Sequence, residues 1–392
     1  MPPCRPVVRF LIECLRRFHN TSMTRNQIFR SVFGSYQLLS YVLREREMRI
    51  VTLPIVAVVV FNLLLPNNAF SNELADRTAL KNEVVRLFAL EQFSQLEELS
   101  ARYRTSKSRT SSGLWQLTVF YSGFSWAFNA KHKEHEFWLN TERSAKKWVT
   151  DYPNSATAHL AYAEMLLNHG WSFRGYGYAK SVAPQNWKPF HDYVQKARAY
   201  LEKYKDVASS DPHWYDLMIK IAYAQSWPEL EISKILSEGL QRESLFYEIY
   251  FAAIEYYTPK WGGSAAAIEN FAREALERTR SAEGFTIYAR IYWYASQAQF
   301  GDRLFSESLV DWATMKKGIN DVLKKYPDNW NINFFAKFAC LSKDKAMTAE
   351  LIARITEAPL KAAWKHPSLF QRCKAWASNS TPTPEPISYR GG

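Results

Sequence analysis

The sequence predicts an all-α protein in which degenerate tetratricopeptide-like helical hairpins form an α-solenoid. Three observations support this prediction. Apolar residues recur with helical spacing through most of the chain, alternating β-branched runs are absent, and only 14 glycines serve 392 residues. Turns that contain Pro or Gly divide the chain into blocks of helix length. The 14 Trp, 22 Tyr and 24 Phe suit packing between helices.

Two stripes of apolar residues predict the first helical hairpin. In the first stripe the residues follow the spacing i, i+4, i+7 and i+8, and the second stripe begins after a short break. The stripes are Leu80, Val84, Leu87 and Phe88, then Phe93, Leu96, Leu99 and Tyr103.

Two Tyr-Pro turns mark a repeat. Lys146-Lys-Trp-Val-Thr-Asp-Tyr-Pro-Asn154 and Asn320-Asp-Val-Leu-Lys-Lys-Tyr-Pro-Asp328 each end a predicted helix at Tyr-Pro, and a helix rich in small or aromatic residues follows. A helix, a Tyr-Pro turn and a second helix resemble a tetratricopeptide unit. The intervals between such turns vary, so the repeat is degenerate.

The start of the chain predicts export. A short apolar run follows Arg49 and ends near Pro66, and Ala69 and Ser71 fit a signal peptidase site. We therefore expect residues 48–71 to be a signal peptide and residues 1–47 to be an extension from a misassigned start. A transit peptide and an uncleaved anchor are the alternatives for this region, and the second would be the chain's only membrane contact. Both signal-peptide and anchor readings place residue 72 onward outside the cytoplasm, in the periplasm or secreted.

The helical-repeat domain is predicted over residues 72–376. The segment after it, residues 377–392, is rich in Ser, Thr and Pro and is expected to be a disordered tail. The formal net charge is +12, but six of these charges precede Asn72 and the rest are interspersed with acids, so nucleic acid is not an expected partner.

Cys340 and Cys373 are the only cysteines in the predicted exported part. In an oxidising compartment they are expected to form a disulfide, and two buried free thiols are the alternative. Neither a metal-binding motif nor a redox motif accompanies them.

Pro259-Lys-Trp-Gly-Gly-Ser264 is the most distinctive string of the sequence. The glycines allow backbone angles that other residues avoid, and Ser264 can cap a helix that begins at Ala265. Either Trp261 fills a gap between repeats while the glycines make the bend, or the loop contacts a ligand. The candidate binding residues here are Lys260, Trp261, Gly262, Gly263 and Ser264.

Trp171-Ser-Phe-Arg-Gly-Tyr-Gly-Tyr178 is the second unusual string. Its aromatic rings and Arg174 could face an anion or a sugar, which makes Trp171, Arg174 and Tyr176 candidate binding residues. Alternatively, the string is an ordered loop between repeats in which Arg174 donates to backbone carbonyls.

Catalytic and cofactor motifs are not found, so neither an enzymatic activity nor a cofactor is expected. The sequence lacks G-x-S-x-G, and no pair of acids stands out for glycoside hydrolysis. His132-Lys-Glu-His135 places two imidazoles three residues apart on a predicted helix, but it is not H-E-x-x-H and is expected to be a solvated helix face rather than a metal site.

The chain resembles a family of bacterial, mostly exported, tetratricopeptide-like proteins of unknown function. The most specific shared string is Pro259-Lys-Trp-Gly-Gly-Ser264, and the others lie in order across about residues 80–376. They are Phe93-Ser-Gln-Leu-Glu-Glu-Leu-Ser-Ala-Arg-Tyr-Arg104, the Trp148 to Ser155 turn, Phe173-Arg-Gly-Tyr-Gly177, Ser210-Asp-Pro-His-Trp-Tyr215, Phe335-Ala-Lys-Phe-Ala-Cys340 and Cys373-Lys-Ala-Trp376. The resemblance implies a helical-repeat fold and pairing of Cys340 with Cys373, and it implies no activity.

These observations favour a non-catalytic scaffold of the cell envelope that binds a protein or peptide partner. The alternative is a carbohydrate-active (α/α) enzyme or a glycan-binding protein, which requires acids that face an aromatic-lined cleft. A structural or stress-related envelope protein is a third possibility.

Overall fold

The computed structural model describes residues 72–378, and the predicted extension, signal peptide and most of the tail lie outside them. Within the described residues the secondary structure is helical, with one isolated β-bridge between Arg109 and Trp115. The all-α prediction is confirmed. The helices are α4 (Glu73–Ala89), α5 (Phe93–Ser106), α6 (Gln116–Ala127), α7 (His135–Asp151), α8 (Ala156–Arg174), α9 (Trp187–Lys203), α10 (Lys205–Ala208), α11 (His213–Ala224), α12 (Glu229–Arg242), α13 (Tyr247–Tyr257), α14 (Ala265–Glu283), α15 (Thr286–Ala295), α16 (Leu304–Glu307), α17 (Trp312–Lys325), α18 (Asn329–Leu341), α19 (Lys345–Ala353), α20 (Lys361–Trp364) and α21 (Pro367–Ala377).

Short helical turns complete the described chain. They are the 3₁₀ turns η2 (Ala179–Ser181), η3 (Pro184–Asn186), η4 (Pro259–Trp261) and η6 (Gly301–Arg303), and the π-helical turn η5 (Ser296–Phe300).

Helical hairpins repeat along the chain as the Tyr-Pro turns predict. Tyr152 ends α7, Ser155 caps α8, Tyr326 ends α17 and Asp328 caps α18. Both caps accept a hydrogen bond from a backbone N–H of the helix that they begin, which satisfies a donor without an intrahelical partner. The first predicted hairpin is also confirmed, as α4 and α5.

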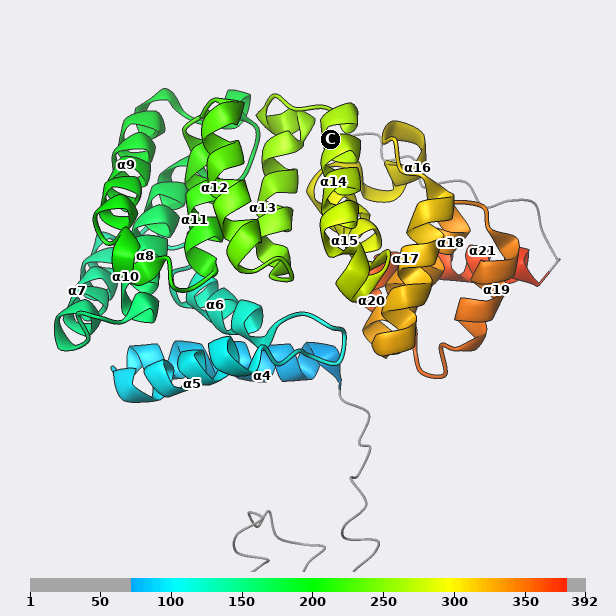
Figure 1. Cartoon of the computed structure of the whole chain (residues 1–392), viewed down its shortest axis with the longest axis horizontal. Helices are drawn as coiled ribbons and strands as arrows, with labels where there is room; N and C mark the ends of the chain where they lie inside the picture. Colours follow the sequence, from blue (N-terminus) through cyan, green and yellow to red (C-terminus); the bar gives the residue numbers. More distant parts are fainter. Residues whose placement is uncertain (1–71, 379–392) are drawn as a thin grey trace, which may run out of the picture. The chain divides into compact units, whose positions relative to one another are not determined.

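The helices form two rows that differ in burial. The outer row, α7, α9, α12, α14 and α17, buries one stripe of each helix, such as Ile268, Phe271, Ala272 and Ala275 on α14. The inner row, α8, α11, α13, α15 and α18, is buried almost all round, with consecutive members in contact. Figure 1 shows α9 to α15 side by side. This arrangement is the predicted α-solenoid of hairpins.

The first hairpin departs from simple stacking. Helix α4 packs along α6 and also reaches α18, and α6 packs on α8. Arg104 of α5 forms an ion pair with Asp211 at 2.7 Å and donates to Thr157 Oγ1 on α8 at 2.7 Å. Tyr121 of α6 donates to the same carboxylate at 2.7 Å. The hairpin therefore lies against the inner row instead of adding one more repeat to its end.

Residues 107–115, here called the central loop, are held by a buried polar network. Glu73, which is 2% exposed, accepts hydrogen bonds from the hydroxyls of Thr110, Ser111 and Ser112 and pairs with Arg77. Burial alone would raise the pKa of Glu73, but Arg77 and these hydroxyls outweigh it and hold that pKa below its usual value. The carboxylate of Glu73 is thus fixed in its charged form.

The central loop also contacts the last repeats. The carbonyl oxygen of Ser112 accepts hydrogen bonds from Arg290 on α15 and from Asn331 on α18, the second at 3.0 Å. Gly113 has a φ of +94°, and a Cβ there would lie 2.6 Å from the ring of Tyr326. Only glycine fits both the backbone angle and the space. The loop therefore joins α4 to α15 and α18.

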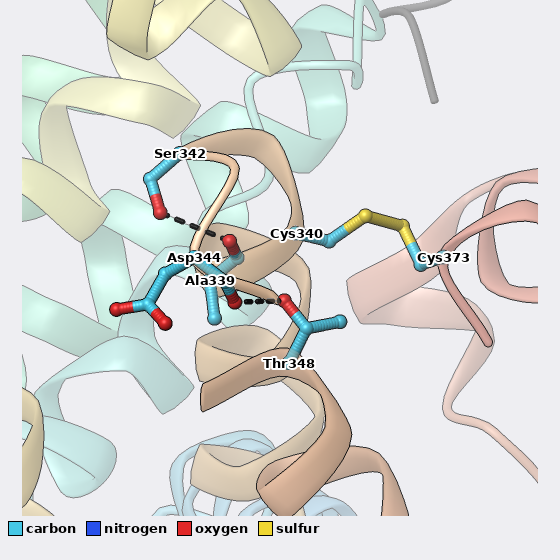
Figure 2. The surroundings of a disulfide bond; sticks show 6 residues. All are labelled: Ala339, Cys340, Ser342, Asp344, Thr348 and Cys373. Atoms are coloured by element: carbon cyan, nitrogen blue, oxygen red, sulfur yellow. Dashed lines mark hydrogen bonds between the residues drawn. A yellow bond between two sulfur atoms is a disulfide. The ribbon is translucent and has the colours of Figure 1, made fainter. Parts of the chain in front are cut away.

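A disulfide fixes the last helix. Cys340 at the end of α18 is bonded to Cys373 on α21, with 5.8 Å between their Cα atoms (Figure 2). Both residues are buried. The predicted pairing is present, and α21 ends at Ala377, one residue beyond the predicted end of the domain.

Within residues 72–378, no helix combines the length and the apolar character that crossing a bilayer needs. The described part of the chain therefore offers no membrane span.

Removing the disulfide should destabilise the domain. The bond joins residues 33 positions apart, and closing a loop of that size in the unfolded chain corresponds to about 3–4 kcal/mol. We expect the Cys340→Ala/Cys373→Ala variant to lose about that much free energy of unfolding in urea titrations. Reductant should destabilise the wild type and leave the variant unchanged, whereas equal stability of the two oxidised proteins would contradict the expectation.

Candidate functional site

The two distinctive strings of the sequence meet in space. The rings of Trp171 and Trp261 lie 6.1 Å apart at 86°, and Lys260 Nζ donates to the carbonyl oxygen of Tyr176 at 3.2 Å. Tyr223 of α11 packs against Trp261 at 4.9 Å. We call this group, Trp171, Arg174, Tyr176, Tyr223, Lys260 and Trp261, the aromatic corner.

Arg174 occupies the centre of the aromatic corner. Its guanidinium lies 5.1 Å from the rings of both Trp171 and Trp261, and its Nη1 donates to the carbonyls of Gly175 and Gly177. Burial lowers the pKa of Arg174, which Tyr223 partly opposes. Arg174 is 7% exposed. Its bonds to backbone carbonyls are those of the alternative in which the string is an ordered loop between repeats.

The Pro259–Ser264 string shapes the turn between α13 and α14. Gly262 has a φ of +93°, and a Cβ on Gly263 would lie 2.1 Å from the carbonyl oxygen of Tyr257. Ser264 caps α14 by accepting from the N–H of Ala267 at 3.1 Å, as predicted. Trp261 donates to Glu255 at 3.3 Å. The glycines and Ser264 therefore build the bend, and Lys260 and Trp261 project from it.

The Trp171–Tyr178 string is less of a loop than expected. Helix α8 continues through Trp171 to Arg174, and only the segment from Gly175 leaves the helix. The helix extends because Trp171 and Arg174 are buried against neighbouring helices, at 5% and 7% exposure. Tyr176 and Tyr178 lie beyond it and are 63% and 58% exposed. Tyr176 stacks on Trp171, with 5.3 Å between ring centroids. The accessible part of this site is therefore the exposed Tyr176 ring, which lies on the buried Trp171 ring.

A second group was not singled out from the sequence. Glu164, His213, Asp216, Lys220 and Glu248, here called the charged cluster, come from the inner helices α8, α11 and α13. His213 Nε2 donates to Glu164 at 3.3 Å, its Nδ1 lies 3.0 Å from Asp216 Oδ2, and Lys220 pairs with Asp216 at 2.8 Å. Helix α6 covers the cluster, because the Tyr121 ring stacks on His213 at 3.9 Å.

The charges of the cluster set opposite protonation preferences. Burial disfavours the charged imidazole, but Asp216 and Glu164 outweigh it and raise the pKa of His213 to about 9. Burial likewise disfavours the Asp216 carboxylate, but Lys220 and His213 hold its pKa below the usual value. Glu248 differs, because burial and the Asp216 charge raise its pKa to about 7 against the opposing charge of Lys220. Oε2 of Glu248 has no hydrogen-bond partner.

The charged cluster adjoins the aromatic corner. Lys220 and Tyr223 lie one turn apart on α11, and the charges of Asp216 and Glu255 both raise the pKa of Tyr223, for which burial is the largest cause. The acids of this region thus face the inner row and its rings instead of solvent. The glycan alternative requires acids that face an aromatic-lined cleft, and it stays a prediction.

The cluster has a sequence signal that only its surroundings make meaningful. His213, Asp216 and Lys220 follow the spacing i, i+3 and i+7 within the otherwise apolar helix α11, so they share one face. Periodicity alone does not distinguish such a face from a solvated one. Contact with α6, which lies far away in the sequence, is what makes this face of α11 a buried one.

The His132 and His135 pair is not on one helix, contrary to the sequence-based expectation. Helix α7 begins at His135, and His132 lies in the preceding turn, where its ring stacks on Phe137 at 4.0 Å. Glu134 has an extended backbone, with φ of -72° and ψ of 121°, so the helix starts only after it. Among residues 72–378, no group of three or more His, Cys, Asp or Glu could hold a metal ion.

Comparison with known proteins gives no match, whether with protein-family models, curated proteins or solved structures. The family resemblance described above stays a prediction, and the site is interpreted from its own geometry.

Neutralising Glu248 should stabilise the fold in a pH-dependent way. The pKa of Glu248 rises from 4.5 to about 7 on folding, so its ionisation disfavours the folded state increasingly between these two values. Below pH 4.5 both states are protonated and the penalty is absent, and above pH 7 it is fully present. We expect the stability difference between Glu248→Gln and the wild type to grow by roughly 1–3 kcal/mol from pH 4.5 to pH 8.

Urea titrations at both pH values measure this change. The matched control is Glu277→Gln on α14, whose carboxylate is 68% exposed and should matter little. A stability difference for Glu248→Gln that stays constant with pH would contradict the assignment.

Proposed function

We propose that the chain is an exported, non-catalytic helical-repeat protein of a bacterial cell envelope, and that its aromatic corner binds an extended segment of a partner protein. One observation supports this most directly. Tyr176 and Tyr178 are exposed large aromatics, and Lys260, from a distant part of the sequence, donates to the carbonyl oxygen of Tyr176.

The aromatic corner has the properties of an interface anchor. Tyrosine offers a large contact area with a polar hydroxyl, and such rings often supply much of the binding free energy. Tyr176 already stacks on Trp171, and Lys260 already holds the Tyr176 carbonyl, so binding would order few additional groups. A peptide supplies side chains and backbone groups that suit both the rings and the Lys260 ammonium.

Export is supported by the cysteine pair and by the composition of the chain's start. Disulfides persist mainly in oxidising compartments such as the periplasm and the extracellular space, and Cys340 and Cys373 are bonded. Together with the apolar segment before residue 72, this favours a periplasmic or secreted location.

Site-specific cross-linking tests the proposed partner surface. A photoreactive phenylalanine analogue is placed at Tyr176, and in a matched control at Leu230, which is also exposed, at 70%, but lies on α12. Both proteins are irradiated with envelope extract, and cross-linked peptides are sequenced. We expect a defined peptide at position 176 and none at position 230.

The recovered peptide is then synthesised and titrated against variants. Because Tyr176 and Tyr178 are exposed, Tyr176→Ala/Tyr178→Ala should keep the wild-type melting temperature and weaken binding at least about tenfold, or about 1.4 kcal/mol. Equal cross-linking at both positions, or unchanged affinity of the double variant, would remove the aromatic corner from partner binding.

A glycan ligand is the second candidate, and the exposed rings of Tyr176 and Tyr178 are the observation that favours it, because aromatic faces stack well on sugar rings. Envelope polysaccharide that abolishes the cross-link at position 176, where the synthetic peptide does not, would favour this candidate over peptide binding.

A further inference from the structure

A small cavity, partly open to the surface at Gln297, has no lining residue in common with the aromatic corner. It has a volume of about 120 Å³ and lies between α4, the central loop, α13, α15 and α18. Its lining includes two guanidinium groups and four aromatic rings, namely Arg77, Arg290, Phe251, Trp293, Tyr294 and Trp330. Gln297, which is exposed, lies at its edge.

The rings give the cavity flat walls. Phe251 and Tyr294 are stacked at 4.9 Å with an interplanar angle of 3°, so a ligand ring can extend this stack on an outer face. The Arg77 guanidinium lies 5.2 Å from the Trp330 ring, and that of Arg290 lies 5.7 Å from the Trp293 ring. Each cation is therefore held on an aromatic face. A planar ligand would meet rings on its faces and guanidinium groups at its edge.

Arg290 differs from the neighbouring arginines in its hydrogen-bond partners. Arg77 pairs with Glu73, and Arg109 pairs with Glu283 at 3.3 Å. The hydrogen bonds of Arg290 go to the neutral acceptors Ser112 O and Asn331 Oδ1.

Arg290 has unused hydrogen-bonding capacity. It is 4% exposed, and its Nε has no partner. Burial, Arg77 and Arg109 lower the pKa of Arg290, although Tyr247 and Glu283 act in the opposite direction. A buried guanidinium with an N–H that has no acceptor is unfavourable, and an anion in the adjoining cavity would relieve the cost.

We propose that this cavity binds an aromatic carboxylate, with the carboxylate on Arg290 and Arg77 and the ring against Phe251 and Tyr294. An apolar cavity of about 150 Å³ accommodates one benzene ring, so at about 120 Å³ this cavity encloses the carboxylate and part of the ring, and the rest of the ligand extends past Gln297. Guanidinium groups recognise a carboxylate through paired N–H donors, which a neutral amide does not match. This inference is independent of the proposed function, because it concerns a different site.

Two sources share this chemistry. The ligand is either a free aromatic acid or the C-terminal aromatic residue of a peptide, whose carboxylate and ring are similarly placed. Phenylacetate represents the first source, and N-acetyl-L-phenylalanine and a tripeptide that ends in phenylalanine represent the second.

Calorimetric titration of the full chain tests the proposal, with phenylacetamide and N-acetyl-L-phenylalanine amide as neutral controls. We expect at least one carboxylate to bind at least tenfold more tightly than its amide. The tighter class of carboxylate identifies the source. Absence of binding up to 10 mM, or equal binding of acid and amide, would overturn the proposal.

Variants locate the binding in the cavity. Arg290→Gln should abolish the preference for carboxylate, but it also removes bonds to the central loop. Gln297→Trp, at an exposed position on the cavity's edge, should block entry and weaken binding at least tenfold without unfolding the protein, whereas Gln299→Trp, outside the lining, should leave it unchanged. Full binding by Gln297→Trp would place the ligand elsewhere.

Cross-linking at position 176 should be unaffected by Gln297→Trp, so failure of one proposal does not imply failure of the other.

Discussion

The buried carboxylate of Glu73 and the central loop that surrounds it constrain the rest of the structure. A carboxylate that is 2% exposed is stable only where its oxygens accept enough hydrogen bonds. Thr110, Ser111 and Ser112 supply them, which pulls the loop inside. Loops are normally at the surface because their backbone groups need water. Here Arg290 and Asn331 replace water as hydrogen-bond donors to the Ser112 carbonyl oxygen.

This network changes the physical character of the repeat array. In a simple solenoid each repeat contacts only its neighbours, so stability is a sum of local contributions. The central loop adds hydrogen bonds between residues 178 and 219 positions apart in the sequence. It leads directly into α6, whose Tyr121 covers the charged cluster, and its Ser112 carbonyl accepts from Arg290 beside the cavity. The charged cluster and the Arg290 guanidinium therefore both lie where the first hairpin departs from regular stacking.

Local features could be predicted from the sequence, and long-range ones could not. The Tyr-Pro turns, the Ser264 cap and the glycine bend follow from neighbouring residues, and each is where the pattern predicts it. The helix at Trp171 was missed because burial of Trp171 and Arg174 against distant helices extends α8 past the expected loop. The charged cluster was missed for the same reason, since only contact with α6 turns a polar helix face into an interior one. The meeting of the two strings also depends on tertiary packing, on which neither string carries information.

Native-state hydrogen exchange of Glu73→Gln tests the role of the central loop most directly. Loss of the carboxylate weakens the anchor of the loop, so we expect amides of α15 and α18 to exchange at least tenfold faster together with those of α4, while those of α9 and α12 keep their wild-type rates. Faster exchange confined to α4, α5 and α6 would show that the repeats are stabilised only by their neighbours and would contradict the account.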